Sequence, residues 1–363
     1  MPKLTPAELG YSVVAEWEPH AATWLGWPLN AEDWPGKFVP IRWVYGEIVR
    51  ALTRLGDERV RIVADNERHK EQAMAVLEKA GVERERVEFY VCQMNRGWMR
   101  DCMPAFARRQ TAANADERVE DELAAIKFTF NGWAKYDNWQ FDNALANRLS
   151  PLTGWRIIEA MAGKRQFVLE GGAVEANGRG TLIATEECLL DELTQTRNPG
   201  MNKAEIEQAL KDNLGVSNVL WLGKGIAGDD THGHIDDFCR FVNPTTVVLA
   251  QEDNPYDANY TSLEENRERL EGMTLESGHR VEVVPLPMPA PLEFDGMRLP
   301  ASYANFYIAN NAVLVPTFND PNDRAALGIL AELFPGRAVV GIHAVDLVWG
   351  LGTLHCLTHE EPL

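Results

Sequence analysis

The chain has 363 residues, of which 45% are hydrophobic and 25% charged, a composition typical of a globular protein with a substantial core. Its formal net charge of −19 disfavours binding to nucleic acid or anionic lipid and mildly favours the approach of a cationic ligand. The five cysteines form no CxxC pair, which argues against a disulfide framework or a structural zinc site and favours a reducing compartment. The sequence has no apolar run of about 18 or more residues and no secretory signal, so we expect a cytoplasmic protein that makes no membrane contact.

The first predicted elements are an apolar strand and a hairpin. The strand covers residues 20–28 (HAATWLGWP). The hairpin has its turn near Gln110, after the segment MPAFARR. We predict that its returning strand is delayed to residues 126–130 by the acidic insert at residues 115–124.

Three further hairpins follow at a regular interval. Residues 172–184 read as a strand, an Asn-Gly turn and a strand. Residues 237–250 repeat the pattern with a turn near Asn243, and residues 305–318 repeat it with a turn near Asn310. The three turns lie 66 and 67 residues apart, and one more step of 67 toward the N-terminus reaches the turn of the first hairpin.

Helix signals lie between the hairpins. Residues 204–215 end at a glycine suited to a helix C-terminus, and residues 324–334 follow an Asp-Pro pair that predicts a helix start. Short apolar strands follow at residues 216–223 and 337–344. Each unit therefore reads as hairpin, helix and strand over about 67 residues, and five units account for nearly the whole chain. Repetition on this scale predicts a propeller or an array, here one α/β domain over residues 1–363.

The fifth hairpin is incomplete, because the chain ends soon after HCLTHEEPL. The strand at residues 20–28 could supply the missing partner. We therefore expect the two ends of the chain to pair and close a ring.

The period aligns four polar side chains. Asp101 lies nine residues before its turn, Glu170 seven and His234 nine, and Cys356 begins the incomplete fifth unit. Each comes at the entry to an equivalent strand. A ring would therefore bring all four to one axial mouth.

Taken singly, these residues allow other interpretations. Asp101 alone could be a surface or capping residue. Glu170 stands before two glycines, which suits either a close approach to the backbone or a simple turn. A single cysteine is usually a buried apolar residue, the interpretation we adopt for the other four; Cys356 differs because His355 and Thr358 flank it.

The segment 228–238 (GDDTHGHIDDF) is the densest polar cluster. On a strand, His232, His234 and Asp236 would point to one face. A zinc hydrolase is an alternative, because THGHIDD is close to an HxHxDH ligand motif. Asp237 replaces the last histidine of that motif, and the other histidines show no matching spacing, so we expect no metal.

Several motifs occur in a specific order: MxRDxxP, LEGG, GDDTHGHIDD, SYANFYIANNAVLVPTFNDPNDRAA and WGLGTLHCLT, after an opening AEWEPHAATWLGWP. Together they resemble the agmatine deiminase branch of the peptidylarginine deiminase-like family. The resemblance covers nearly the whole chain. It implies the pentein fold, a five-bladed α/β propeller with pseudo-fivefold symmetry, in agreement with the period of about 67 residues.

The resemblance also implies a role for six side chains. Cys356 resembles the nucleophile and His234 the general acid–base. The others match three carboxylates and one aromatic residue: Asp101 and Asp236 for gripping a guanidinium, Glu170 beside the histidine, and Trp98 along the substrate's alkyl chain.

Two motifs depart from the family pattern. Residues 100–104 read RDCMP where RDTGP is common, which suggests a different backbone position. The C-terminal motif reads GLGTLHC where plant-type agmatine enzymes have GGGNIHC. The second departure bears on agmatine as the substrate more than on deimination.

The chemistry expected from this set is hydrolysis of a guanidinium. Two carboxylates can hold the nitrogens of this delocalised cation, and a thiolate is a strong nucleophile near neutral pH. We expect conversion of agmatine and water to N-carbamoylputrescine and ammonia through a thiouronium intermediate on Cys356, without metal or organic cofactor. Peptidyl or free arginine as substrate, a zinc hydrolase and a non-catalytic binding module are the alternatives.

The only partner that we expect is a small guanidino cation. The oligomeric state stays open. Tryptophans are frequent near the N-terminus and suit the core better than an interface: Trp17, Trp24, Trp27, Trp34 and Trp43.

Overall fold

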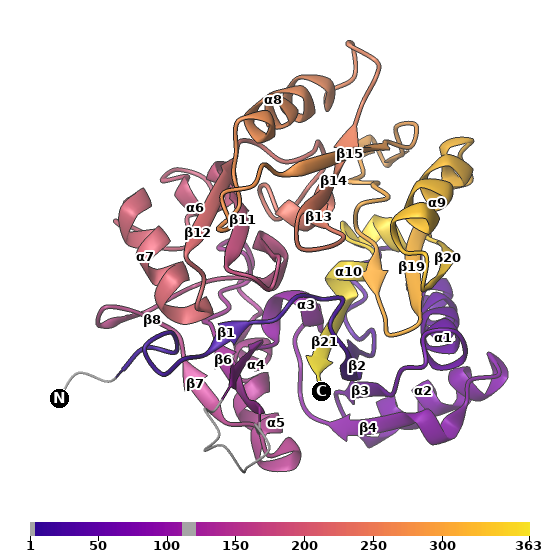
Figure 1. Cartoon of the computed structure of the whole chain (residues 1–363). Coiled ribbons are helices and arrows are strands. Elements are labelled where there is room, and N and C mark those ends of the chain that lie inside the picture. The colour runs from indigo at the N-terminus through magenta and orange to yellow at the C-terminus, as the bar shows by residue number, and fades with distance from the viewer. Residues whose placement is uncertain (1–3, 111–120) are drawn as a thin grey trace.

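The computed structural model describes residues 4–110 and 121–363 (Figure 1). Of the acidic insert, residues 115–120 lie outside the described residues. The described chain folds into small mixed sheets with helices around them.

Five sheets of the described residues share one pairing pattern, in which an antiparallel pair is followed by a parallel pair. Three of them have three strands: β10 (Val174–Ala176), β11 (Thr181–Thr185) and β12 (Asn218–Leu222); β13 (Cys239–Phe241), β14 (Thr246–Gln251) and β15 (Glu282–Pro287); β18 (Tyr307–Ile308), β19 (Ala312–Thr317) and β20 (Ala338–His343). Two have four strands: β1 (Ser12–Val13), β5 (Ala105–Gln110), β6 (Asp121–Lys127) and β7 (Ile157–Glu159); β21 (Thr358–Pro362), β2 (His20–Gly26), β3 (Val60–Ala64) and β4 (Val87–Val91).

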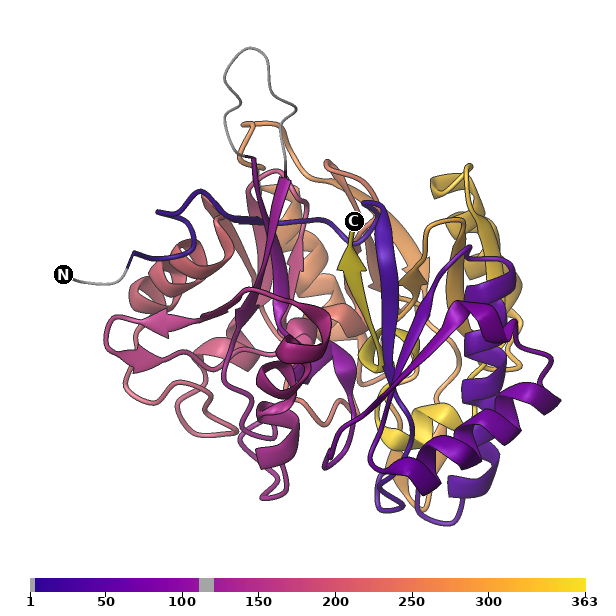
Figure 2. The same ribbon diagram turned by 90° about the horizontal axis from the view of Figure 1, so that it is seen from below.

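The long helices lie on the outside of the molecule and the sheets lie toward its centre (Figures 1 and 2). These helices are α1 (Phe38–Arg54), α2 (Glu67–Lys79), α5 (Leu145–Thr153), α7 (Lys203–Leu214), α8 (Tyr260–Glu271) and α9 (Asn322–Leu333). Shorter elements fill the connections: η1 (Arg84–Arg86), α4 (Gln140–Asn143), α6 (Glu186–Leu190), η4 (Leu347–Gly350) and the ribbons β8–β9 (Met161–Ala162, Arg165–Gln166) and β16–β17 (Glu293–Phe294, Met297–Arg298).

The three hairpins predicted after residue 170 are confirmed, as are the two helices predicted at residues 204–215 and 324–334. Helix α7 ends where predicted, at Gly215, which adopts a left-handed conformation with φ of 66°. Helix α9 begins at Asn322, whose N–H donates to the Asp320 carboxylate at 2.8 Å. The turn and start signals therefore acted locally, as their chemistry requires.

The returning strand of the first hairpin begins earlier than predicted. β6 starts at Asp121, inside the acidic insert, and pairs with β5 up to Gln110. Backbone pairing does not require apolar side chains, and Glu122 forms ion pairs with Arg109 and Arg156. The prediction from residue 126 was wrong because it relied on the apolar run alone.

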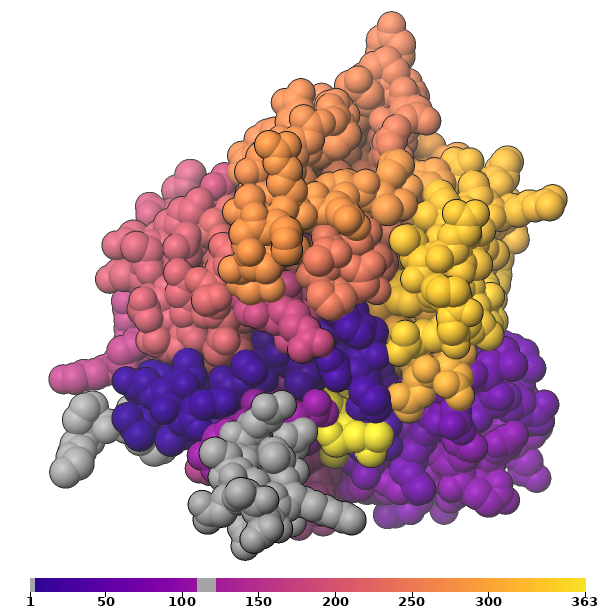
Figure 3. Space-filling model, viewed as in Figure 1, coloured from indigo at the N-terminus to yellow at the C-terminus, as the bar shows by residue number. Residues whose placement is uncertain are grey.

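The two ends of the chain pair as expected. β2 runs antiparallel to β21, with His20 opposite Pro362 and Leu25 opposite Thr358. Figure 2 shows the two strands side by side. In Figure 3 the N-terminal segment before β2 crosses the centre of the visible face, next to the C-terminus.

Three of the N-terminal tryptophans belong to the core. Trp24 and Trp27 are fully buried and Trp34 is 1% exposed, whereas Trp43 is 45% exposed on α1. Within the described residues, no helix has both the length and the apolar surface needed to cross a membrane.

Candidate active site

Four single helical turns carry polar side chains toward the centre of the molecule. Each lies just before a strand of an antiparallel pair: α3 (Met99–Cys102) before β5, η2 (Gly171–Ala173) before β10, η3 (Ile235–Asp237) before β13 and α10 (Leu354–Leu357) before β21. α3 contacts α10 and η2, and η2 contacts η3. Segments far apart in the sequence therefore meet at one point.

The structure brings together the five polar residues selected from the sequence. Asp101, Asp236 and Cys356 lie on these turns, and Glu170 and His234 directly precede η2 and η3. None of the five is more than 8% exposed. We refer to them as the catalytic cluster.

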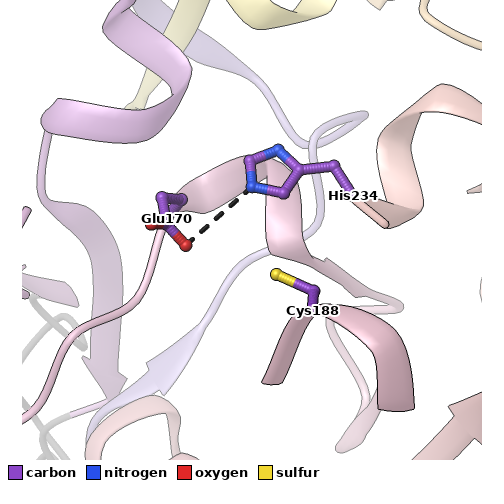
Figure 4. Close-up of side chains that lie close together, drawn as sticks. All are labelled: Glu170, Cys188 and His234. Carbon is purple, nitrogen blue, oxygen red and sulfur yellow. Dashed lines mark ion pairs between the residues drawn. The ribbon is translucent and has the colours of Figure 1, made fainter. Parts of the chain in front are cut away.

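The imidazole of His234 lies among three carboxylates. Its Nδ1 is 3.9 Å from Asp101 Oδ1 and 3.9 Å from Asp236 Oδ1, and its Nε2 is 3.9 Å from Glu170 Oε2. Figure 4 shows the ring facing Glu170, with the sulfur of Cys188 nearby. Burial opposes the charged ring, but Asp101, Cys188 and Glu170 raise the pKa of His234 well above its usual range.

Asp101 is fixed by two neutral donors. Its Oδ1 accepts the N–H of Gly172 at 3.0 Å, and its Oδ2 accepts the indole N–H of Trp133 at 2.8 Å. Burial raises the pKa of this carboxyl, and His234 only partly offsets the effect. Among the described residues, no arginine or lysine forms an ion pair with Asp101.

Asp236 is held through one oxygen only. Its Oδ2 lies 2.6 Å from Nδ1 of His355 and 3.3 Å from Nδ2 of Asn305. Its Oδ1 is buried and has no hydrogen-bond partner in the described part of the chain. Burial raises the pKa of Asp236, but His355 and His234 outweigh burial and the pKa is lowered overall.

The thiol of Cys356 lies beside the same carboxylate. Sγ is 3.8 Å from Asp236 Oδ2 and 3.1 Å from Nδ2 of Asn305. Burial and the negative charges of Asp236, Asp237 and Asp101 raise the pKa of Cys356 well above its usual range. The thiol is therefore protonated at neutral pH unless a cation arrives beside it.

Two glycines allow the backbone to approach the catalytic cluster. A Cβ on Gly172 would lie 2.6 Å from Nδ1 of His234 and 3.0 Å from Oδ1 of Asp101. A Cβ on Gly352 would lie 2.9 Å from the Trp98 ring and 3.1 Å from Sγ of Cys356. The close approach predicted for LEGG is therefore real, and it is made by the other members of the cluster.

A cavity of about 500 Å³ opens onto Asp101 and Cys356. Its walls combine aromatic rings and carboxylates, including Trp98, Trp133, Tyr136 and Trp349 with Glu32, Asp33, Asp137 and Asp230. The arginine in this lining, Arg96, is paired with Asp33 and stacks over Tyr136 at 3.8 Å from the ring centroid. The cavity therefore suits an elongated cation with an apolar middle.

His232 does not join the cluster. The expected strand does not form, because His232 and Gly233 adopt positive φ angles of 65° and 91°. The His232 ring turns away, and its Nε2 lies 2.9 Å from Asp191. The expectation that His232, His234 and Asp236 share one strand face was wrong, since two left-handed residues interrupt the alternation.

Sequence reasoning missed several residues that touch the cluster, among them Asn305 and Cys188. Asn305 precedes β18 and contacts Asp236 and Cys356 through Nδ2. Its position in the repeat, just before the first strand of a sheet, was the signal that could have found it. Cys188, accepted as an ordinary buried cysteine, lies beside His234 on α6, and no sequence pattern indicated that contact.

One donor set near the cluster resembles a metal site. The ligand atoms of Glu170, Cys188 and His234 lie within 4.8 Å of one another. Glu170 is already paired with the guanidinium of Arg197, which donates to Oε1 at 3.1 Å. A buried positive charge at this distance opposes a metal cation, so these residues do not fit one.

The profile of the Porphyromonas-type peptidyl-arginine deiminase family matches residues 12–362. The chain belongs to this family. This deiminase is 35% identical to the agmatine deiminase of Medicago truncatula, over 99% of its own length and 98% of the relative's. It is 33% identical to the agmatine deiminase of Pseudomonas aeruginosa (strain LESB58), with the same coverage.

A solved structure supports the same relationship. The agmatine deiminase of Enterococcus faecalis superposes on this deiminase with a TM-score of 0.88 and 29% identity, over all of this chain and 98% of that one. The chain therefore has the mixed α/β fold of the agmatine deiminases. The family resemblance inferred from the motifs is confirmed, and it places the chain among hydrolases of carbon–nitrogen bonds.

Proposed function

We propose that this deiminase converts agmatine and water to N-carbamoylputrescine and ammonia through a covalent bond between Cys356 and the guanidinium carbon. The observation that carries the proposal is the pair of buried carboxylates, Asp101 and Asp236, beside a thiol and without an arginine or lysine partner among the described residues. A buried carboxylate oxygen without a hydrogen-bond donor is unfavourable. A bound guanidinium adds positive charge to that of His234 and His355 and donates hydrogen bonds to both carboxylates.

In the proposed first step, the bound cation favours loss of the thiol proton to solvent through the cavity. The thiolate of Cys356 then forms a bond to the guanidinium carbon. His234, which is protonated because its pKa is raised, gives a proton to one terminal amino group, and the C–N bond breaks to release ammonia. The carbon is left as a cationic thiouronium on sulfur.

In the second step, neutral His234 takes a proton from water as its oxygen bonds to the same carbon. The C–S bond then breaks, and the hydroxyl proton of the adduct passes to the departing sulfur, which releases the neutral ureido product and restores the thiol of Cys356. Glu170, 3.9 Å from Nε2 of His234, stabilises the imidazolium in both steps. Arg197 keeps Glu170 ionised: burial opposes this, but Arg197 and His234 lower the pKa of Glu170 to about 2.

The cavity favours an amine at the far end of the substrate. Its lining includes Glu32, Asp137 and Asp230, of which Asp230 is paired with Lys135, and its arginine, Arg96, is engaged by Asp33. An α-carboxylate of free arginine would meet mainly negative charge there. The names of the relatives support agmatine, and peptidyl arginine is the second candidate because the family model bears that name.

The finer description of the protein belongs to the same proposal. We take residues 1–363 as one catalytic domain in the cytoplasm, with no cofactor and with the substrate as its only partner. The shared pairing order of the five sheets supports their assignment as blades of a pentein propeller.

Product analysis tests the proposal. Purified protein is incubated with agmatine, arginine and an arginyl peptide, and ammonia and ureido products are quantified by mass spectrometry. We expect N-carbamoylputrescine from agmatine at a kcat/KM at least a hundredfold above the other two. Citrullinated peptide as the main product would instead assign peptidyl arginine, and no ureido product from any of the three would refute deimination.

A further inference from the structure

Behind the catalytic cluster lies a second group of buried charges that the proposed chemistry does not use. It consists of Glu16, Arg100, Arg240 and His355, which we call the rear cluster. Glu16 Oε2 lies 3.1 Å from Nη2 of Arg100, 3.0 Å from Nη2 of Arg240 and 2.7 Å from Nε2 of His355. None of the four is more than 8% exposed.

His355 joins the rear cluster to the catalytic cluster. Its Nδ1 lies 2.6 Å from Asp236 Oδ2, and its Nε2 lies 2.7 Å from Glu16 Oε2. Ionised carboxylate oxygens only accept hydrogen bonds, so both ring nitrogens must donate and the ring is an imidazolium. These are short, charge-assisted contacts, which hold their partners firmly.

The contact with His355 leaves the other oxygen of Asp236 open. Asn305 also contacts Oδ2, at 3.3 Å, while Oδ1 has no hydrogen-bond partner among the described residues. A Cβ built on Gly172 would be 3.1 Å from Oδ1, so that oxygen lies on the side of His234 and Asp101. Of the two oxygens of Asp236, only Oδ1 has no competing hydrogen bond from the described residues.

We infer that His355, itself held by Glu16, is a positioning residue that fixes Asp236 through Oδ2 so that Oδ1 faces the substrate guanidinium. The inference rests on the proposed function, because the guanidinium is the ligand that Oδ1 would receive. His355 does not touch the reacting atoms in this assignment. It acts through Asp236.

The support behind His355 comes from a different part of the chain. Glu16 belongs to the N-terminal segment that crosses the centre of the face in Figure 3, and its Oε1 accepts the N–H of Ile308 at 2.8 Å. Arg100 and Arg240 each have a second carboxylate, Glu360 at 2.8 Å and Glu175 at 2.9 Å. Glu16 is therefore held by Arg100, Arg240 and the backbone N–H of Ile308, and these contacts fix the carboxylate that binds the imidazolium of His355.

Alkylation of Cys356 by two matched reagents tests the inference. 2-Chloroacetamidine is a cation that the carboxylates can grip, and 2-chloroacetamide is its neutral counterpart of nearly the same size. The ratio of their labelling rates, measured by intact mass with peptide mapping, reports the carboxylate grip separately from the reactivity of the thiol. In wild-type protein we expect the amidine to react faster by at least a hundredfold.

In His355→Gln we expect this ratio to fall about tenfold or more, because a hydrogen bond to a charged group is lost. The KM for agmatine should rise by more than kcat falls. His359→Gln is the matched control: His359 is also buried, on β21 directly after α10, but its Nε2 bonds only the carbonyl of Pro104 within the described residues. Its ratio should stay within twofold of wild type.

Glu16→Gln should lower the ratio about threefold to tenfold, since it acts one step further away. An unchanged ratio in folded His355→Gln overturns the inference, and so does an equal loss with both reagents. If His355→Gln does not fold, an unchanged ratio in Glu16→Gln overturns it instead. Failure of the proposed function looks different: wild-type protein would then show no preference for the amidine and release no ammonia from agmatine.

Discussion

The buried carboxylates in the two regions on either side of Asp236 have different kinds of partner. In the rear cluster, Glu16 contacts two arginines and a histidine. On the cavity side, Asp101 has only neutral donors in hydrogen-bond contact within the described residues, and Oδ1 of Asp236 has none. Burial is similar in both regions, so the difference lies in direct contact with cations: His234 stays 3.9 Å from Asp101 and from Oδ1 of Asp236, whereas Glu16 touches all three of its charged partners. The cavity side therefore leaves a carboxylate oxygen for a cationic ligand, and both oxygens of Glu16 are already occupied.

The largest effect should come from removing the sulfur on the cavity side. We expect Cys356→Ala to lower kcat for agmatine hydrolysis by about ten-thousandfold or more, because the proposed covalent step then has no nucleophile. Ammonia release measures the loss. Cys92→Ala is the control, because Cys92 directly follows the edge strand β4, and it should keep nearly full activity. Retention of activity by Cys356→Ala would exclude covalent catalysis by Cys356.

A methyl group at the meeting point of the cluster should have the next largest effect. In Gly172→Ala the new Cβ would lie 2.6 Å from Nδ1 of His234, which forces the ring or the backbone to move. We expect kcat/KM to fall about a hundredfold, since small misplacements of reacting groups are costly. Gly328→Ala on α9 is the matched control, because its Cβ would meet nothing within 4 Å; it should keep full activity and gain slightly in stability. Equal activities in the two variants would contradict the close packing.

In the absence of substrate, the rate at which Cys356 is alkylated should rise with pH. Burial and nearby carboxylates raise the pKa of Cys356, so its thiolate fraction grows as pH rises and falls as pH drops. We expect the rate of labelling by neutral chloroacetamide to rise about tenfold per unit from pH 7 to pH 9. Intact-mass measurement of samples quenched at successive times gives the labelling rate. A labelling rate that stops rising below pH 8 would show that the thiol already ionises without a bound cation.

The smallest effect separates the two regions through ligand-induced stabilisation. In the Cys356→Ala background, saturating agmatine should raise Tm by about 3 °C or more, because it binds only the folded state. Adding Asp101→Asn should remove most of this shift. Adding Glu175→Gln, which leaves Arg240 with one partner fewer, should instead lower Tm without ligand and preserve the shift. Differential scanning fluorimetry measures Tm for the single variant and both double variants. Loss of the ligand-induced shift in both double variants would show that the two regions do not act separately in ligand binding.

The comparison also explains which parts of the site were predictable. Asp101, Glu170, His234 and Cys356 stand at equivalent points of a repeat, so their meeting could be expected from spacing alone. His232 could not be placed, because a positive φ at His232 and Gly233 depends on the local path of the chain. Cys188 lies beside His234 because of the way α6 packs, and no sequence motif predicts that contact.

The fold shows the same division. Turn residues such as Asn243 and the C-terminal glycine of α7 have strong local preferences, and the elements formed where these preferences predicted. The early start of β6 was missed, because pairing with β5 extends it into polar residues. Local chemistry decides where a turn lies, whereas strand length depends on the partner.

By itself, the sequence determined the repeat, the hairpins, the pairing of the two chain ends and the family. The repeat and the hairpins depend on periodicity and on local conformational preferences, the pairing of the ends was inferred from the incomplete fifth unit, and the family from the order of the motifs. Only the tertiary structure decided which carboxylate oxygens touch a cation and which do not, since Glu16 and His355 are 339 residues apart and meet only when the ends of the chain pair. Charge compensation in a buried site is a property of distances, and distances between remote residues exist only in the fold.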